Sequence, residues 1–142
     1  MPGHRLQLDI LPESLAICRL AFDAPIPVWA TARPFFTVSR TTEELSVICP
    51  ADQVPAGVTA SDGWRALKLR GLFDLGVVGI LVAIAAPLAS AGISIMPVAT
   101  YDTDYVLVRE TELERAIDAI RRAGHDVHAP SDVRVSVPPI VL

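Results

Sequence analysis

The sequence predicts an α+β protein made of two tandem units that share one order of strands and helices, the first with reduced helices. Three observations predict this fold: an apolar composition, alternating strand and helix patterns in the second half, and a repeated strand–turn–strand segment. The chain has 142 residues, of which 51% are hydrophobic. That length suits one domain or two very small ones, and the composition is sufficient for a buried core.

Composition also excludes several function classes. The net charge is −4 and no block of Lys or Arg is present, which argues against binding to nucleic acids or anionic membranes. The N-terminal MPGHRLQLD lacks the apolar core of a signal peptide. Cys18 and Cys49 lie in apolar stretches without a CxxC motif, which is typical of buried thiols in a cytoplasmic protein, although the sequence leaves a disulfide open.

One uncharged segment, residues 75–101, is long enough to span a membrane. Pro87, Gly92 and Pro97 interrupt it, however, and its second part, ISIMPVAT, is rich in β-branched residues. We therefore predict a buried helix over residues 77–91 followed by a buried strand, and no membrane span.

The second half of the chain gives the clearest order of elements. TELERAIDAIRRAG has an apolar stripe at helical spacing, Thr111 and Glu114 fit a capping box, and Gly124 is placed to end the helix. WRALKLRG alternates as a strand. The expected elements are strands over 64–70, 93–100, 105–109 and 126–128 and helices over 77–91 and 112–123. This β-α-β-β-α-β order is that of a ferredoxin-like unit.

The first half repeats part of this pattern. FFTVSRTTEELSVICP can be laid on SIMPVATYDTDYVLVRE without a gap, which places Thr41 on Tyr101. SLAICRL likewise resembles RALKLR, while Pro25 and Pro27 restrict DAPIPVWATAR to a turn or two of helix. The first unit therefore has the strands of the second but reduced helices.

These patterns predict a trimmed unit over residues 1–60, a complete unit over 61–128 and a C-terminal tail over 129–142. VTASDG joins the two units. RLQLDI near the N-terminus and VRVSV near the C-terminus both alternate as strands, and either can complete the sheet of the trimmed unit. Pro138 and Pro139 indicate that the last strand lies at an edge.

A candidate site follows from the topology of the complete unit. In a split β-α-β arrangement, the loop over 71–80 and the hairpin over 100–104 lie at the same end of the sheet. The unpaired N–H groups at the start of the long helix favour a carboxylate, and Gly76 and Gly79 permit close approach. Asp102 and Asp104 can hold an ammonium or guanidinium group. Together these features are typical of an amino-acid site.

The same residues also have purely structural interpretations, which the sequence leaves open. Aspartates in hairpins are often solvated or form Asx-turns. Asp74 can be an N-cap or turn residue, and Gly76 and Gly79 can serve helix–sheet packing alone.

These residues carry a family resemblance. RGLFDLGVVGILVAIAAPLASAGISIMPVATYDTDYVLVRETELERAI resembles an ACT domain. With LPESLAICRL, FFTVSRTTEELSVICP and GWRALKLRG included, most of residues 8–128 resemble small stand-alone tandem-ACT proteins of bacteria. Those proteins are similar to the regulatory domains of aspartate kinases and to the ACT units of the cytosolic arginine sensor.

The resemblance implies a site at the same place. It assigns ligand contacts to the backbone after the first strand and to the end of the second, and it implies that ligands sit between ACT units, so that RTTEE (40–44) contributes. The sensor family has an acidic residue where this chain has Val77, so a neutral amino acid fits at least as well as arginine. The expected ligand-binding residues are Asp74, Gly76, Val77, Val78, Gly79, Ile80, Thr100, Tyr101, Asp102 and Asp104.

Two short motifs in the sequence fit other chemistries. DTDYV fits the D-x-D-x-[TV] nucleophile motif of haloacid-dehalogenase-type phosphatases, but no lysine follows Asp104 and the chain soon ends. His125, Asp126 and His128 form a conceivable metal group at a helix exit, although such residues are usually exposed. No P-loop and no G-x-G-x-x-G motif is present.

The sequence therefore predicts a non-enzymatic, cytoplasmic regulatory module that binds an amino acid, with neither cofactor nor metal. A homodimer or side-by-side ACT assembly is expected. The alternative function is a ligand-free interaction or assembly subunit.

Overall fold

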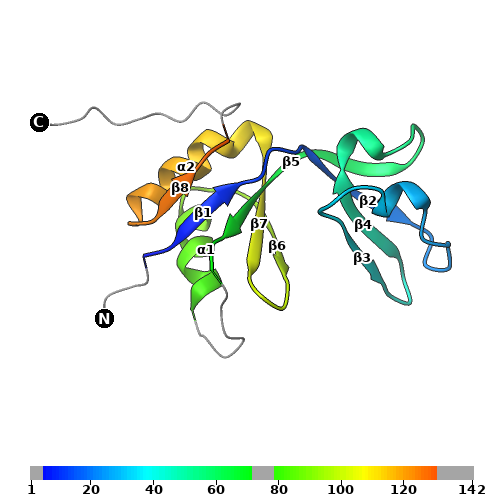
Figure 1. Cartoon of the computed structure of the whole chain (residues 1–142), viewed down its shortest axis with the longest axis horizontal. Helices are drawn as coiled ribbons and strands as arrows, with labels where there is room; N and C mark the ends of the chain where they lie inside the picture. Colours follow the sequence, from blue (N-terminus) through cyan, green and yellow to red (C-terminus); the bar gives the residue numbers. More distant parts are fainter. Residues whose placement is uncertain (1–4, 72–78, 131–142) are drawn as a thin grey trace, which may run out of the picture. The chain divides into compact units, whose positions relative to one another are not determined.

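The computed structural model describes residues 5–71 and 79–130, which form two compact units (Figure 1). The small unit comprises residues 13–64, and the large unit comprises the described residues before 13 and after 64. These limits differ from the expected division at residue 60. The first twelve residues belong with the large unit because their strand pairs there.

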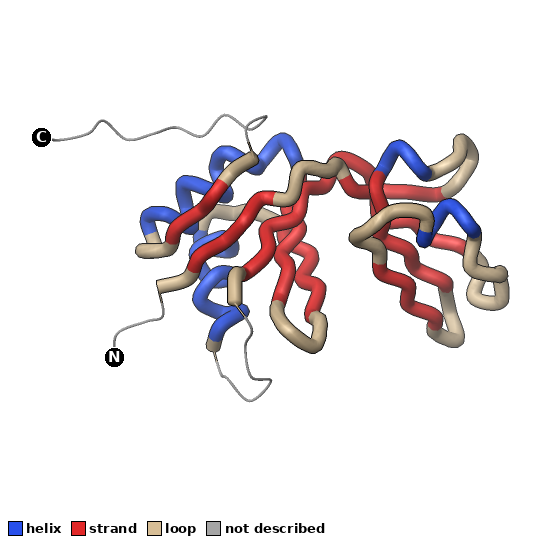
Figure 2. The backbone as a smooth tube through the Cα atoms, viewed as in Figure 1, coloured by secondary structure: helices blue, strands red, loops and turns tan. Residues whose placement is uncertain are grey.

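The small unit is an antiparallel sheet with little helix. Its order is β3 (Thr37–Arg40), β4 (Leu45–Pro50), β2 (Leu15–Leu20) and the first part of β5 (Thr59–Leu69). Only two short 3-10 helices lie within it, η1 (Val28–Thr31) and η2 (Ala51–Gln53) (Figure 2). This confirms the reduced helices that the prolines predicted. Its core consists of Ala16, Cys18, Ala30, Leu45, Val47 and Cys49.

The large unit has the predicted β-α-β-β-α-β order. After β5 come α1 (Ile80–Ser90), β6 (Ile95–Ala99), β7 (Asp104–Arg109), η3 (Glu110–Glu112), α2 (Leu113–Arg122) and β8 (Asp126–His128). Both helices pack on one core with the sheet, since their apolar stripes join it. That core includes Leu8, Leu67, Leu69, Ile80, Ile84, Leu88, Val106, Val108, Leu113, Ala116, Ile117 and Ile120. None of the helices within the described ranges combines the length and apolar character that crossing a membrane needs.

The N-terminal strand β1 (Gln7–Ile10) lies in the large unit, not in the small one. It runs antiparallel to β5, with Leu8 opposite Leu69, and parallel to β8, so the sheet order is β6-β7-β5-β1-β8. Its alternation buries Leu6, Leu8 and Ile10 in the core of the large unit. The pattern predicted the strand but assigned it to the wrong partner. VRVSV, the second strand considered for that place, lies outside the described residues.

Two further expectations differ from the structure, and a third is confirmed. VTASDG is not a linker, because residues 59–61 extend β5 and pair with β2. Thr111 lies within η3, and no side-chain cap bond begins α2; the Glu112 carboxylate instead pairs with Arg115. Gly124, with φ of 97°, does follow α2, as its position predicted.

A buried hydroxyl fixes the hairpin between β6 and β7. Thr103 is 7% exposed, and its Oγ1 donates a hydrogen bond to the carbonyl oxygen of Leu69 at 2.9 Å. The start of β7 is thereby held beside the end of β5.

We expect Thr103→Val to lower the free energy of unfolding by about 1–2 kcal/mol, because it leaves a buried carbonyl oxygen without that donor. Thr42→Val, at the exposed tip of the small unit's hairpin, is the matched control and should change stability by less than about 0.5 kcal/mol. Urea unfolding measures both. Equal effects of the two substitutions would show that the hydroxyl bond contributes nothing.

The two cysteines of the small unit are free thiols in its core. Burial, with a further contribution from the neighbouring Cys49, raises the pKa of Cys18 to about 11. Burial also raises the pKa of Cys49. Both side chains lie on one face of the β2–β4 pair, where Cys49 is directly opposite Ala16.

We expect both thiols to react slowly with an aromatic disulfide reagent in the native protein. At a pKa of about 11, on the order of one Cys18 side chain in a thousand is a thiolate at about pH 8. Absorbance should show two thiols reacting rapidly only after a denaturant is added. Rapid reaction of either thiol in native buffer contradicts the buried environment.

Candidate functional site

Three segments of the large unit meet at one end of its sheet. They are the end of β5, the hairpin between β6 and β7, and the start of α1 (Figure 1). The bond from Thr103 to Leu69 joins the first two directly. This is the end at which the sequence placed the amino-acid site.

The hairpin is ordered by its own threonine. The Thr100 N–H donates to the carbonyl oxygen of Thr103 at 2.9 Å, and Thr100 Oγ1 donates to the same oxygen at 3.0 Å. Thr100 Oγ1 also accepts the Thr103 N–H at 3.2 Å. The Thr100 side chain, expected to contact ligand, is therefore engaged within the turn.

The aspartates of this hairpin carry no compensating charge. Asp102 is exposed and Asp104, the first residue of β7, is half-buried. Among residues 5–71 and 79–130, neither carboxylate makes an ion pair or side-chain hydrogen bond. Tyr101 is 83% exposed at the tip. The hairpin thus presents negative charge and an aromatic ring to solvent.

The start of α1 presents backbone donors. Gly79 is the N-cap, with a φ of 85° that favours glycine, and no side chain of a described residue caps the helix. The first helical bond runs from the Ala83 N–H to the Gly79 carbonyl at 2.9 Å, so the N–H groups before Ala83 have no acceptor within the helix. Ile80 contributes backbone only, because its side chain is buried in the core. The other expected residues, Asp74, Gly76, Val77 and Val78, lie outside the described residues.

The cation nearest in sequence to this end is already paired. Arg70, just after β5, donates from Nε and Nη2 to the two carboxylate oxygens of Asp9, each at 2.8 Å. The hydrogen bond from Arg70 lowers the pKa of Asp9. Arg70 is thereby held toward β1 and pairs with Asp9, not with the hairpin aspartates.

The hairpin of the small unit is built alike but uses its charges differently. The Thr41 N–H bonds the Glu44 carbonyl at 2.9 Å, as Thr100 bonds Thr103, so Thr41 corresponds to Thr100 and not to Tyr101. The gapless alignment of the two segments, which paired Thr41 with Tyr101, is therefore shifted by one residue at the turns. Arg40 donates to the carbonyls of Phe22 and Ala24, and Glu44 pairs with Arg19. The charged ends of RTTEE are thus partly engaged within their own unit.

Sequence reasoning missed Thr103 as the residue that positions the hairpin. The predicted site included Asp102 and Asp104, on either side of it. Because side chains alternate along a strand, outward-facing Asp102 and Asp104 require the residue between them to face inward. That alternation was the available signal.

The other two chemistries gain no support from the described residues. In DTDYV, Asp102 sits at an exposed turn between antiparallel strands. His125 Nδ1 accepts a backbone N–H and His128 Nε2 contacts Gln7. Within the described ranges, no three or more His, Cys, Asp or Glu side chains gather so as to hold a metal ion.

Comparisons with known proteins agree with this architecture. A sequence profile of the ACT domain matches residues 59–122, and a second profile, described as an N-terminal domain, matches residues 13–57. The chain is 31% identical over 101 residues to the cytosolic arginine sensor for mTORC1 subunit 1 of Rattus norvegicus. That match covers 66% of this chain and spans only 30% of the length of the sensor.

Two solved structures extend the likeness. A protein of Agrobacterium tumefaciens is 35% identical with a TM-score of 0.87, over 94% of this chain and 100% of that one. The ligand-free regulatory subunit of aspartate kinase from Thermus thermophilus shares the fold at 12% identity, with a TM-score of 0.58 over 80% of this chain and 96% of that subunit. The chain, two tandem ferredoxin-like units of which the first has reduced helices, thus contains an ACT domain over residues 59–122.

Proposed function

We propose that the protein is a non-enzymatic regulatory module that binds a free amino acid at the end of the large unit. The hairpin that Thr103 fastens to the end of β5 carries this proposal, because it presents two carboxylates that make no ion pair among the described residues, at the end of the sheet where β5 ends. Asp104 and Asp102 would hold the ammonium group, and the backbone donors at Gly79 and Ile80 would hold the carboxylate. Asp74, Gly76, Val77 and Val78 complete the proposed site.

The relatives support the ligand class. One is named as an arginine sensor and another as the regulatory subunit of aspartate kinase. Neither name describes a catalytic domain, which supports a regulatory role without catalysis. The absence of an acidic residue at Val77 favours a neutral amino acid over arginine. We propose a cytoplasmic location on the same similarity to a cytosolic sensor.

A thermal-shift screen against the common amino acids tests this function. A ligand at about a hundred times its Kd stabilises the folded state by about 2.7 kcal/mol, which raises Tm by about 5–10 °C in a chain of this size. We expect one neutral amino acid to produce such a shift. A flat response across the panel contradicts the proposal.

Asp104→Asn should abolish the shift without lowering the Tm of the unliganded protein, because the Asp104 carboxylate makes no ion pair or side-chain hydrogen bond with the described residues. Asp62→Asn, the same change at an exposed position of the small unit, is the matched control and should leave the shift intact. An unaltered shift in Asp104→Asn would remove this carboxylate from the site.

A second function rests on a different surface. The α1 sequence ILVAIAAPLAS holds no charged residue, and Val82 on it is 64% exposed. The next element along the chain, β6, pairs among the described strands with β7 alone, and its Met96 is exposed. Such a surface suits side-by-side pairing of two copies, whether or not a ligand binds.

We expect Val82→Glu to convert a dimer into a monomer, because it places a charge in an apolar contact. Light scattering coupled to gel filtration measures the mass. Val28→Glu, the same change at a valine of the small unit that is 87% exposed, should leave the dimer intact. A wild-type protein that is monomeric at high concentration contradicts this pairing.

A further inference from the structure

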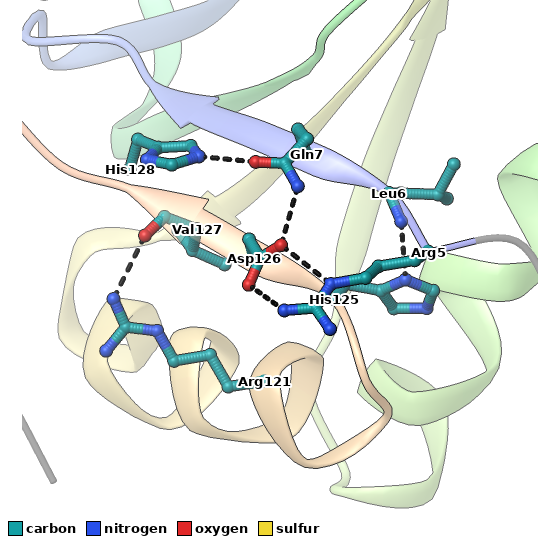
Figure 3. Close-up of polar contacts among 8 residues, drawn as sticks. All are labelled: Arg5, Leu6, Gln7, Arg121, His125, Asp126, Val127 and His128. Carbon is teal, nitrogen blue, oxygen red and sulfur yellow. Dashed lines mark hydrogen bonds and ion pairs between the residues drawn. The ribbon is translucent and has the colours of Figure 1, made fainter.

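A network of side chains connects the starts of the parallel strands β1 and β8 (Figure 3). Arg5 donates from Nε and Nη2 to the two carboxylate oxygens of Asp126, each at 2.9 Å. Gln7 Nε2 donates to Asp126 Oδ2 at 2.6 Å, and Gln7 Oε1 lies 2.6 Å from His128 Nε2. These bonds hold the first residues of β1 against β8.

A buried histidine completes this network. His125 is 7% exposed, and its Nδ1 accepts the backbone N–H of Leu6 at 3.0 Å (Figure 3). Because the partner is a donor, Nδ1 must carry a lone pair, which requires the neutral imidazole with its proton on Nε2. A proton added to Nδ1 would set two donors against each other and leave the Leu6 N–H without an acceptor.

His128 is arranged in the opposite way. The Gln7 amide donates its N–H to Asp126, so its oxygen is the atom that faces His128. His128 Nε2 therefore donates, and an imidazole donates equally well after it takes up a second proton. Of the two histidines at this strand pair, only His125 is bonded in a way that protonation breaks.

We propose that His125 is an acid-sensitive latch for the start of β1. The neutral ring accepts the Leu6 N–H, and a solvent proton that adds to the Nδ1 lone pair removes this acceptor and releases the Leu6 amide. The bond from the Asp126 N–H to the Leu6 carbonyl, at 2.9 Å, and the bonds of Arg5 and Gln7 to Asp126 remain. No covalent bond breaks, and reversal requires only that the proton leave.

Charged side chains lie on each element packed against His125. The elements packed against His125 bring Arg5 from the start of β1, Asp126 from β8, and Arg121 and Arg122 from the last turn of α2. The one carboxylate in this set is already bonded by Arg5 and Gln7. The carbonyl end of α2 favours a cation, but the two arginines already occupy that region.

The latch acts on one edge of β1 only. On the opposite edge, the Arg70 N–H donates to the Gln7 carbonyl at 2.8 Å, and the Leu11 N–H donates to the Ala66 carbonyl at 2.9 Å. The ion pair with Arg5 also survives mild acid, because the hydrogen bonds from Arg5 hold the pKa of Asp126 at about 2. Loss of the His125 bond therefore leaves the Arg5 ion pair and the pairing of β1 with β5 intact.

Amide hydrogen exchange of the full chain, resolved by NMR, tests the latch. We expect the protection factor of the Leu6 amide, corrected for intrinsic exchange, to fall at least about tenfold between about pH 7.5 and pH 5, the range in which imidazoles take up protons. The Leu11 amide, bonded to Ala66, is the internal control and should keep its protection. A Leu6 protection factor that does not change with pH overturns the proposal.

Two matched substitutions assign the effect to one ring. The side-chain oxygen of His125→Asn can accept the same N–H but takes up no proton, so Leu6 should stay protected at about pH 5. His128→Asn should retain the wild-type fall. If His125→Asn does not fold, the ¹⁵N shift of His125 Nδ1 in the wild type decides, because it must change over the same pH range as Leu6 protection. A fall that persists in His125→Asn, or that does not follow this shift, overturns the latch.

Discussion

The pairing of β5 with different strands along its length is the constraint on which both units depend. Residues 59–64 pair with β2 in the small unit, and Leu67 and Leu69 pair with β1 in the large unit. Because side chains alternate along a strand, this one register decides which residues of β5 enter the core of the large unit. It also decides where β5 ends, and therefore where the Leu69 carbonyl meets the hairpin.

The position of β1 beside β5 has an electrostatic consequence for the proposed site. With Asp9 opposite Lys68 on the neighbouring strand, Arg70 reaches the Asp9 carboxylate in a bidentate pair. The guanidinium is then held on the β1 side of β5, whereas the hairpin lies on the β7 side. An N-terminal strand that takes no part in the site thereby leaves Asp104 free to attract a cationic group from solution.

Local patterns predicted the large unit well, and non-local pairing explains what they missed. The apolar stripe from Leu113 to Ile120 and the helix-ending Gly124 place α2 to within a residue or two, because helical periodicity depends on neighbouring residues. The alternation in RLQLDI predicts a strand but contains nothing about its partner, so β1 was assigned to the wrong sheet. The hairpin aspartates could be identified from the sequence. The role of Thr103 could not, because it depends on a hydrogen bond to Leu69, which is distant in sequence.

The two hairpins show how one fold can serve different purposes within a single chain. Both turns are closed by a threonine at the same position, Thr41 and Thr100. In the small unit the adjoining Arg40 and Glu44 are bonded to their own unit, so their charge stabilises a part of the chain that has only short helices. The large unit has two full helices and a larger core, and its hairpin carboxylates form no such bonds among the described residues. The carboxylates of Asp102 and Asp104 are therefore available to a ligand, whereas Arg40 and Glu44 of the small unit are not. For this reason we propose the amino-acid site in the large unit alone.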